Sequence, residues 1–149
     1  MDAMRNILPN EAPLLENPRE NPRGVEKMRA PRVLVVDDER LVRWSIAETL
    51  GALGYAVIEA ADAKSALDAF DEDVDVVLLD LHLPDCNDMS VLARMRRIAP
   101  ATPVIVMTAF ATPAALSEAA AHGAPILPKP FDLHDLAARV RQALSDCIY

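Results

Sequence analysis

The sequence is poor in cysteine, in long apolar runs and in positive charge, and each shortage excludes a class of protein. It has 149 residues but only two cysteines, Cys86 and Cys147, which lie far apart. We therefore expect free thiols in a cytoplasmic protein rather than a disulfide framework. No apolar run is long enough to span a bilayer, and no signal-peptide pattern opens the chain. The formal net charge of −8 argues against nonspecific binding to nucleic acid or to an anionic membrane.

Residues 1–31 differ in composition from the rest of the chain. The tetrapeptide Glu-Asn-Pro-Arg occurs twice in succession, at 16–19 and 20–23, and the apolar residues show little periodicity. Prolines that would interrupt a helix recur at Pro9, Pro13, Pro18, Pro22 and Pro31. We therefore expect a disordered or extended N-terminal tail over residues 1–31, either a mobile leader or a docking arm for a partner.

From Arg32 onward, short apolar runs alternate with segments of helical periodicity. Continuous apolar runs predict buried strands at 33–36, 74–79 and 103–107. Two shorter runs predict short strands at 56–58 and 126–127. Pro125 and Pro128 flank the last of these, so it should lie at a sheet edge. Five strands that alternate with five helices predict an α/β fold, with a parallel sheet, right-handed crossovers and helices on both faces.

The helices are predicted from apolar spacing and from the residues at their ends. Val42, Ile46, Leu50 and Leu53 recur at helical spacing, and Gly54 follows as a left-handed cap. Asp62 and Asp132 can cap the second and the last helix, and the third helix should run from about Ser90 to Ile98. Trp44, on the first helix, is predicted to be a packing residue.

Polar side chains stand where the predicted strands end. Asp37 and Asp38 follow the first strand, Asp80 ends the third, Thr108 ends the fourth and Lys129 follows the fifth. Parallel strands bring their carboxyl ends to one rim, so these groups should meet. Three carboxylates repel one another unless a cation neutralises them, and a hard oxygen site with room for water suits Mg²⁺. A metal, a lysine and a hydroxyl around a carboxylate nucleophile suffice for phosphoryl transfer.

These motifs resemble the receiver domain of two-component response regulators, over about Arg32 to Leu144. They are Val-Val-Asp-Asp-Glu, Leu-Leu-Asp-Leu-His-Leu-Pro, Met-Thr-Ala-Phe and Pro-Lys-Pro-Phe-Asp, in the family's order and intervals. Val42-Arg43-Trp44 and the segment 127–132 look most like the NtrC-like branch. The resemblance implies a receiver domain over 32–147. It also implies a flavodoxin-like, doubly wound, five-stranded parallel sheet of order 2-1-3-4-5 with five helices.

The resemblance also assigns a role to each rim residue. Asp80 would accept a phosphoryl group from a sensor histidine kinase or a phosphotransfer protein, in a Mg²⁺-dependent reaction. Asp38 would bind Mg²⁺ directly and Asp37 through water, and Asp80 and the backbone carbonyl of His82 would complete the protein ligands. Thr108 would bond a phosphoryl oxygen, and Lys129 would pair with the phosphate.

Further roles follow from the same resemblance. His82 and Phe110 would set the lifetime of the phosphoryl group, and Thr108 with Ile126 would form the output switch. The Lys129–Pro130 bond is expected to be cis.

Three positions depart from the family pattern. Ile126 replaces the usual aromatic residue three positions before the lysine, and the segment 123–129 is one residue shorter than is common. Asp88 stands where the loop after the phosphoacceptor usually has a glycine. The first two departures bear on the output switch, and none touches the phosphorylation chemistry.

A receiver would catalyse only its own phosphorylation and dephosphorylation, and two other classes compete with it. Phosphatases of the haloacid dehalogenase type need a second aspartate two residues after the nucleophile, where this chain has His82. A pseudo-receiver would never be phosphorylated, but the five rim residues are intact. No P-loop or helix-turn-helix motif fits the remaining sequence, so we expect a downstream protein target in trans, or an output domain outside this chain. Homodimerisation on phosphorylation is a further expectation, and direct binding to nucleic acid or membrane is not expected.

Overall fold

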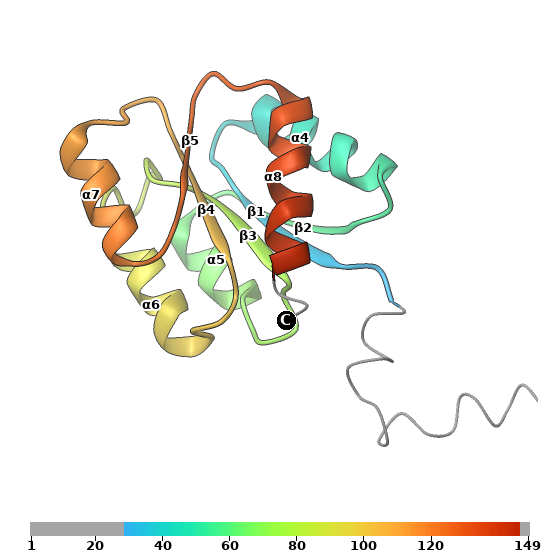
Figure 1. Cartoon of the computed structure of the whole chain (residues 1–149), viewed down its shortest axis with the longest axis horizontal. Coiled ribbons are helices and arrows are strands. Elements are labelled where there is room, and N and C mark those ends of the chain that lie inside the picture. Colours follow the sequence, from blue (N-terminus) through green and yellow to red (C-terminus); the bar gives the residue numbers. More distant parts are fainter. Residues whose placement is uncertain (1–28, 147–149) are drawn as a thin grey trace, which may run out of the picture. The chain divides into compact units, whose positions relative to one another are not determined.

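The structure is a computed structural model that describes residues 29–146. Most of the predicted tail and Cys147 lie outside the described residues. The compact unit that contains the described elements begins at Pro31. Its elements, labelled as in Figure 1, are β1 (Arg32–Val36), α4 (Arg40–Ala52), β2 (Ala56–Ala60), α5 (Ala63–Ala69), β3 (Val76–Asp80), α6 (Ser90–Ile98), β4 (Val104–Thr108), α7 (Pro113–Ala121), β5 (Ile126–Pro128) and α8 (Leu133–Asp146).

The five strands form one parallel sheet in the order β2-β1-β3-β4-β5, which confirms the predicted fold class. The short strand β5, which follows Pro125 and ends at Pro128, lies at an edge as predicted, because proline has no amide hydrogen to donate to a neighbouring strand. The runs of β1, β3 and β4 are almost completely buried, which explains their lack of polar alternation.

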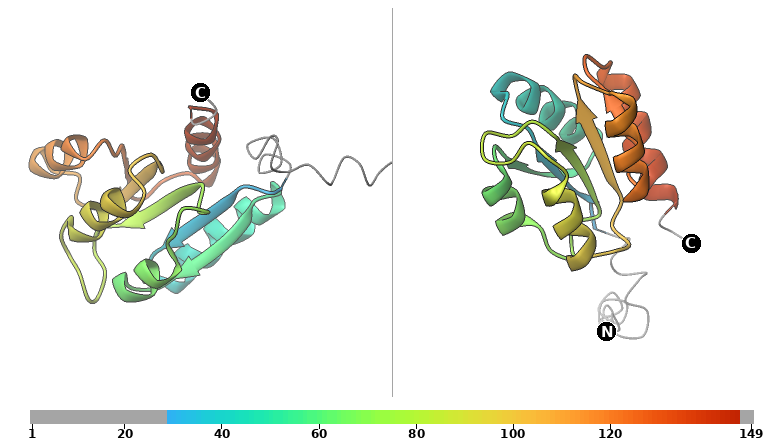
Figure 2. Two further views of the ribbon diagram at one scale, coloured as in Figure 1. Left: turned by 90° about the horizontal axis from the view of Figure 1, so that it is seen from below. Right: turned by 90° about the vertical axis from the view of Figure 1, so that its left-hand side faces the viewer.

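Successive residues of each strand point to opposite faces of the sheet, and each face has its own core. On one face, Leu34, Val77 and Val106 pack with residues of α5, α6 and α7. On the other face, Val35 and Leu78 belong to a second cluster with residues of α4 and α8. Figures 1 and 2 show these helices on the two sides of the sheet. Because all neighbouring strands pair in parallel, their carboxyl ends lie at one rim of the sheet.

The helix ends follow the predicted capping residues. The Asp62 carboxylate accepts a hydrogen bond from the Ser65 amide at 2.8 Å, and Asp132 accepts one from the His134 amide at 2.7 Å. Gly54 adopts a φ of 96° after α4. A Cβ there would meet no atom within 4 Å, so the left-handed backbone, and not lack of space, favours glycine.

One expectation about α4 is wrong. Trp44 was predicted to be a packing residue, but it is 56% exposed. Trp44 lies two positions before the buried Ile46. Two positions correspond to about 200° around the helix, so Trp44 is on the outer face. Leu53 continues the apolar spacing in sequence but is 58% exposed, because α4 ends at Ala52. Within residues 29–146, no helix is long and apolar enough to cross a membrane.

Candidate functional site

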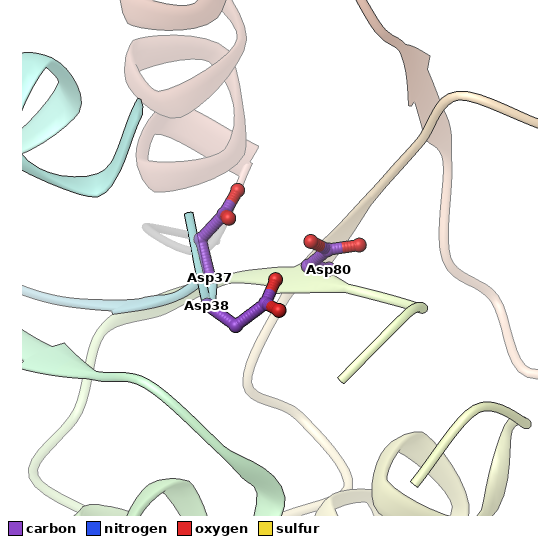
Figure 3. A group of neighbouring side chains, drawn as sticks. All are labelled: Asp37, Asp38 and Asp80. Atoms are coloured by element: carbon purple, nitrogen blue, oxygen red, sulfur yellow. The ribbon is translucent and has the colours of Figure 1, made fainter. Parts of the chain in front are cut away.

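The predicted rim residues come together at the carboxyl ends of adjacent strands. Asp37 and Asp38 follow β1, and Asp80 is the last residue of β3, which is the neighbour of β1 in the sheet. Figure 3 shows their three carboxylates gathered at this point. Thr108 ends β4, on the other side of β3, and Lys129 follows β5.

The three aspartates offer oxygen atoms that lie within 4.8 Å of one another. Asp37 and Asp80 are buried, with 0% and 4% of their surface exposed, whereas Asp38 is exposed. An all-carboxylate set that opens to water on one side is the ligand chemistry Mg²⁺ prefers, because this ion takes few protein ligands and keeps several waters. The residues present therefore fit such an ion.

The Lys129 ammonium group ties the cluster together. Its Nζ atom lies 2.9 Å from Asp37 Oδ2, 3.1 Å from Asp80 Oδ2 and 3.0 Å from Glu39 Oε1. Its backbone amide donates to the Thr108 carbonyl at 2.8 Å, and the Lys129–Pro130 bond is cis as expected. One cation thus contacts both buried carboxylates and links the ends of β1, β3, β4 and β5.

Burial and hydrogen bonding have opposite effects on the pKa values of Asp37 and Lys129. Burial raises the pKa of Asp37 above its ordinary value, the nearby charge of Asp80 adds to this, and the hydrogen bonds from Lys129 and from the Glu39 amide only partly oppose it. Burial alone would lower the pKa of Lys129, but its bonds to Asp37 and Glu39 and the charge of Asp80 raise it overall. Lys129 therefore stays protonated and provides the countercharge of the cluster.

Three of the rim side chains close the same kind of local turn. Asp37 Oδ1 accepts from the Glu39 amide at 2.8 Å, Asp80 Oδ1 accepts from the His82 amide at 2.9 Å, and Thr108 Oγ1 accepts from the Phe110 amide at 3.0 Å. In each case a side chain bonds the backbone two residues later, which turns the chain away from the strand end. These bonds orient the functional groups at the rim.

A pocket of about 710 Å³ opens over the cluster, and its wall extends well beyond the rim residues. Phe110, which is 65% exposed, meets the His82 ring edge-on at the pocket wall, with 5.1 Å between the ring centroids. The pocket is lined by Asp38, Glu39, Val42, Ser45, Asp80, His82, Ala109, Phe110, Lys129, Pro130, Phe131 and Leu133. Ile126 is not among these residues; it lies in the apolar cluster shared with α5, α6 and α7.

Sequence reasoning missed several residues that shape the site. Glu39 was read only as the end of an acidic motif, yet it holds Lys129. Arg43 was read only as part of a family motif, yet it donates to the Asp37 carbonyl at 2.7 Å. Arg43 lies four residues after Glu39, in the first turn of the helix that follows the acidic pair. This position is the sequence signal that could have placed Arg43 near the site.

Comparison with known proteins gives a consistent family. The family model described as "Response regulator receiver domain" matches residues 33–141. The DNA-binding transcriptional regulator NtrC of Azospirillum brasilense is 35% identical over 120 residues, which cover 79% of this chain and 25% of that protein. The transcriptional regulatory protein CpxR of Escherichia coli K12 is 37% identical over 114 residues, which cover 76% of this chain and 49% of that protein.

Solved structures agree with the sequence matches. A CheY-like response regulator receiver domain protein from Methanospirillum hungatei superposes with a TM-score of 0.76 at 26% identity, covering 79% of this chain and 96% of that one. The non-phosphorylated HemR receiver domain from Leptospira biflexa gives a TM-score of 0.74 at 28% identity, covering 77% and 94%.

The matched region accounts for most of this chain but only part of its curated relatives. The chain spans a quarter to a half of the length of the first of these regulators. Receiver domains generally use Mg²⁺ at an acidic pocket, and they interact with histidine kinases or phosphotransfer proteins. The fold, the acidic rim and the extent of the family match agree, and this chain belongs to the response regulator receiver domain family of two-component systems.

Proposed function

We propose that Asp80 accepts a phosphoryl group from a histidine kinase or a phosphotransfer protein. The observation that carries this proposal is the contact of Lys129 with both Asp80 and Asp37, which places a cation beside the buried carboxylate at the end of the central strand. A cation fixed beside the nucleophile can pair with an oxygen of the incoming anionic group and so stabilise the charge that develops there.

In the proposed reaction, a carboxylate oxygen of Asp80 attacks the phosphorus of a phosphohistidine. The O–P bond forms as the N–P bond breaks, and the departing imidazole takes up a proton. The Lys129 ammonium then turns from Asp80 Oδ2 to a phosphoryl oxygen, and the Thr108 hydroxyl donates to another. The movement of Lys129 is short, because it already contacts Asp80 at 3.1 Å, and Thr108 ends the strand next to that of Asp80.

Mg²⁺ is the cofactor of the proposed reaction. Asp37, Asp38, Asp80 and the backbone carbonyl of His82 would hold it, with Asp37 acting through water. The ion would neutralise the carboxylates and the oxygens of the incoming phosphoryl group, which is the main requirement of phosphoryl transfer. Lys129 bonds both Asp37 and Asp80 in the absence of the ion, so we propose that Mg²⁺ binding weakens the contact of Lys129 with at least one of them.

We propose a cytoplasmic protein whose phosphorylated form signals to a protein target in trans, or to an output region outside this chain. The relatives carry names of transcription regulators, and this chain covers only part of their length. For this chain itself we propose no direct contact with nucleic acid, since its net charge is −8. Homodimerisation on phosphorylation belongs to the same proposal.

Intact-mass spectrometry tests the phosphoacceptor. Incubation with acetyl phosphate and Mg²⁺ should add one phosphoryl group, and EDTA should prevent the addition. Asp80→Asn should abolish the adduct. Asp85→Asn is the matched control, because Asp85 lies in the loop that follows Asp80 but uses its carboxylate to cap α5 through the Ala63 amide. An adduct that survives in Asp80→Asn, or that forms in EDTA, would disprove the assignment.

A further inference from the structure

Asp38 differs from the other two aspartates in how it is held. Asp37 and Asp80 each accept hydrogen bonds at both carboxylate oxygens. The Asp38 carboxylate is exposed, and among residues 29–146 no side chain or amide bonds to it. It nevertheless lies with the other two in a group whose oxygens are within 4.8 Å of one another. The position of this proposed direct metal ligand therefore depends on its backbone.

The backbone that carries Asp38 is held from two sides. The Asp37 amide donates to the Ala60 carbonyl at the end of β2, at 3.0 Å. The Asp37 carbonyl, which forms the peptide bond to Asp38, accepts from Arg43 Nη1 at 2.7 Å. Fixing this carbonyl fixes the peptide plane, and the plane sets the direction in which the Asp38 side chain leaves the chain.

Arg43 is itself braced in this position. Its Nε atom donates to Glu59 Oε1 at 3.1 Å, and only 18% of its side chain is exposed. Its amide bonds the Glu39 carbonyl in the first turn of α4, at 2.9 Å. A guanidinium group offers several donors in one rigid plane, so a single side chain can span the β2 carboxylate and the rim carbonyl.

We propose that Arg43, braced by Glu59, is a positioning residue for the metal site, and that it holds Asp38 ready to bind Mg²⁺. This inference rests on the proposed function, since it gives a further role within the same site. Groups that orient metal ligands from outside the coordination shell typically change metal affinity 10- to 100-fold when they are removed.

The direction in which Mg²⁺ affinity changes when Arg43 is replaced distinguishes a positioning role from a purely electrostatic one. Arg43 is a cation beside a cation site, so its charge alone disfavours Mg²⁺, and removing that charge would tighten binding. If Arg43 acts by holding the Asp37 carbonyl, its removal weakens binding instead. Arg43→Met keeps a long apolar side chain but removes both the charge and the donors, so the direction of the change distinguishes the two.

The test is calorimetric titration of Mg²⁺ into the full chain and its variants. We expect Arg43→Met to raise the Kd roughly tenfold, and Arg43→Lys, which keeps one donor group, to restore part of the loss. Arg96→Met is the matched control. Arg96 is also a partly buried arginine that donates to backbone carbonyls, among them those of His122 and Thr102, but these lie in loops away from the rim. Its removal should leave the Kd within about twofold.

A second measurement needs no metal. In the metal-free protein, loss of the bond to the Asp37 carbonyl should shift the amide resonance of Asp38 in ¹H–¹⁵N spectra of Arg43→Met, and Arg96→Met should not shift it. If Arg43→Met does not fold, Glu59→Met, which removes the acceptor of the Arg43 Nε bond, decides at about 0.5 M salt, where the Debye length is about 4 Å and screening suppresses the effect of the lost charge. A raised Kd of this variant for Mg²⁺ supports the proposal that Glu59 braces Arg43 at the metal site, and an unchanged Kd overturns it.

The outcomes separate the two proposals. A folded Arg43→Met that binds Mg²⁺ as well as the wild type, or more tightly, overturns the positioning role alone. A wild type that binds no Mg²⁺ overturns the proposed function, and the positioning role with it.

Discussion

Replacing Lys129 with methionine should lower the free energy of unfolding, and protons or Mg²⁺ should restore part of it. Lys129 contacts Asp37 and Asp80, which are 0% and 4% exposed, so its loss leaves two buried carboxylates without a countercharge. Removing one partner of a buried pair typically costs about 3–5 kcal/mol. The Lys129 side chain is itself 14% exposed, so we expect the lower end, about 3 kcal/mol at pH 7 in EDTA.

Protons and Mg²⁺ should each replace part of the missing charge. Burial already raises the pKa of Asp37, and loss of the Lys129 bond removes the largest opposing contribution. An acid whose folded pKa lies above its unfolded value destabilises the fold at higher pH, and this cost shrinks as the pH falls toward the folded pKa. The difference in stability between variant and wild type should therefore narrow from pH 7 to pH 5. Saturating Mg²⁺ should narrow it as well, because the variant has no lysine competing for its carboxylates and should bind the ion more tightly than the wild type; each tenfold ratio of the two Kd values narrows the difference by about 1.4 kcal/mol.

Urea unfolding at both pH values, with EDTA or with Mg²⁺, measures these differences. Lys64→Met is the matched control, because Lys64 pairs with Asp68 in an exposed ion pair and should change the midpoint little under any condition. A loss below about 1 kcal/mol in EDTA at pH 7 would refute the countercharge role of Lys129. So would a loss of the same size at both pH values.

Two further predictions concern the lifetime of the phosphoryl group and the N-terminal segment. The apolar ring of Phe110 offers no hydrogen bond to a hydrolytic water, so acyl-phosphate loss should be slow, and Phe110→Glu or Phe110→Asn should speed it severalfold in a radiolabel decay assay. Equal decay rates would contradict this. Deletion of residues 1–30 should change the free energy of unfolding by no more than about 1 kcal/mol, because the prolines and the polar repeat of this segment cannot build a core. Loss of cooperative unfolding on truncation would show that the segment is docked.

The features that could be predicted from sequence are those that depend on strand order. Lys129 and Asp37 are 92 positions apart, yet their meeting at one rim was predicted, because a polar residue marks the end of each strand and parallel pairing brings these ends together. The edge position of β5 followed from its two flanking prolines. In each case a local signal was enough once the topology was known.

The features that could not be predicted depend on how side chains cross between loops. The capping of α5 by Asp85 has no periodic signature, and the place of Arg43 in the first turn of α4 indicates only that its side chain starts near the acidic pair, not that it bonds the Asp37 carbonyl. Glu39 stands at the start of α4, where a cap was plausible, but its carboxylate binds Lys129 and leaves that end without a side-chain cap. Such contacts are set by loop geometry, which apolar spacing does not encode.

The contacts of Ile126 bear on the predicted output switch, which Thr108 and Ile126 were expected to form. Ile126 is only 9% exposed and packs with Val106 and Ala119 in the cluster between the sheet and α7. A β-branched side chain has few χ1 choices, so it cannot swing between two places as a surface aromatic ring can. The backbone around it is held as well, by bonds from Val106 to the Pro125 carbonyl and from Arg139 to the Ile126 carbonyl.

A phosphoryl signal should therefore leave the rim through Thr108 and the loop that follows it. The Thr108 hydroxyl already accepts from the Phe110 amide, so its turn toward a phosphoryl oxygen should move this loop and then α7, which starts at Pro113. Methyl NMR with and without beryllofluoride, a phosphoryl mimic, should show larger changes at Ala115 and Leu116 than at Ile126. Asp80→Asn should show none of them. A rotamer change at Ile126 as large as the change at α7 would mean that the isoleucine still works as the switch.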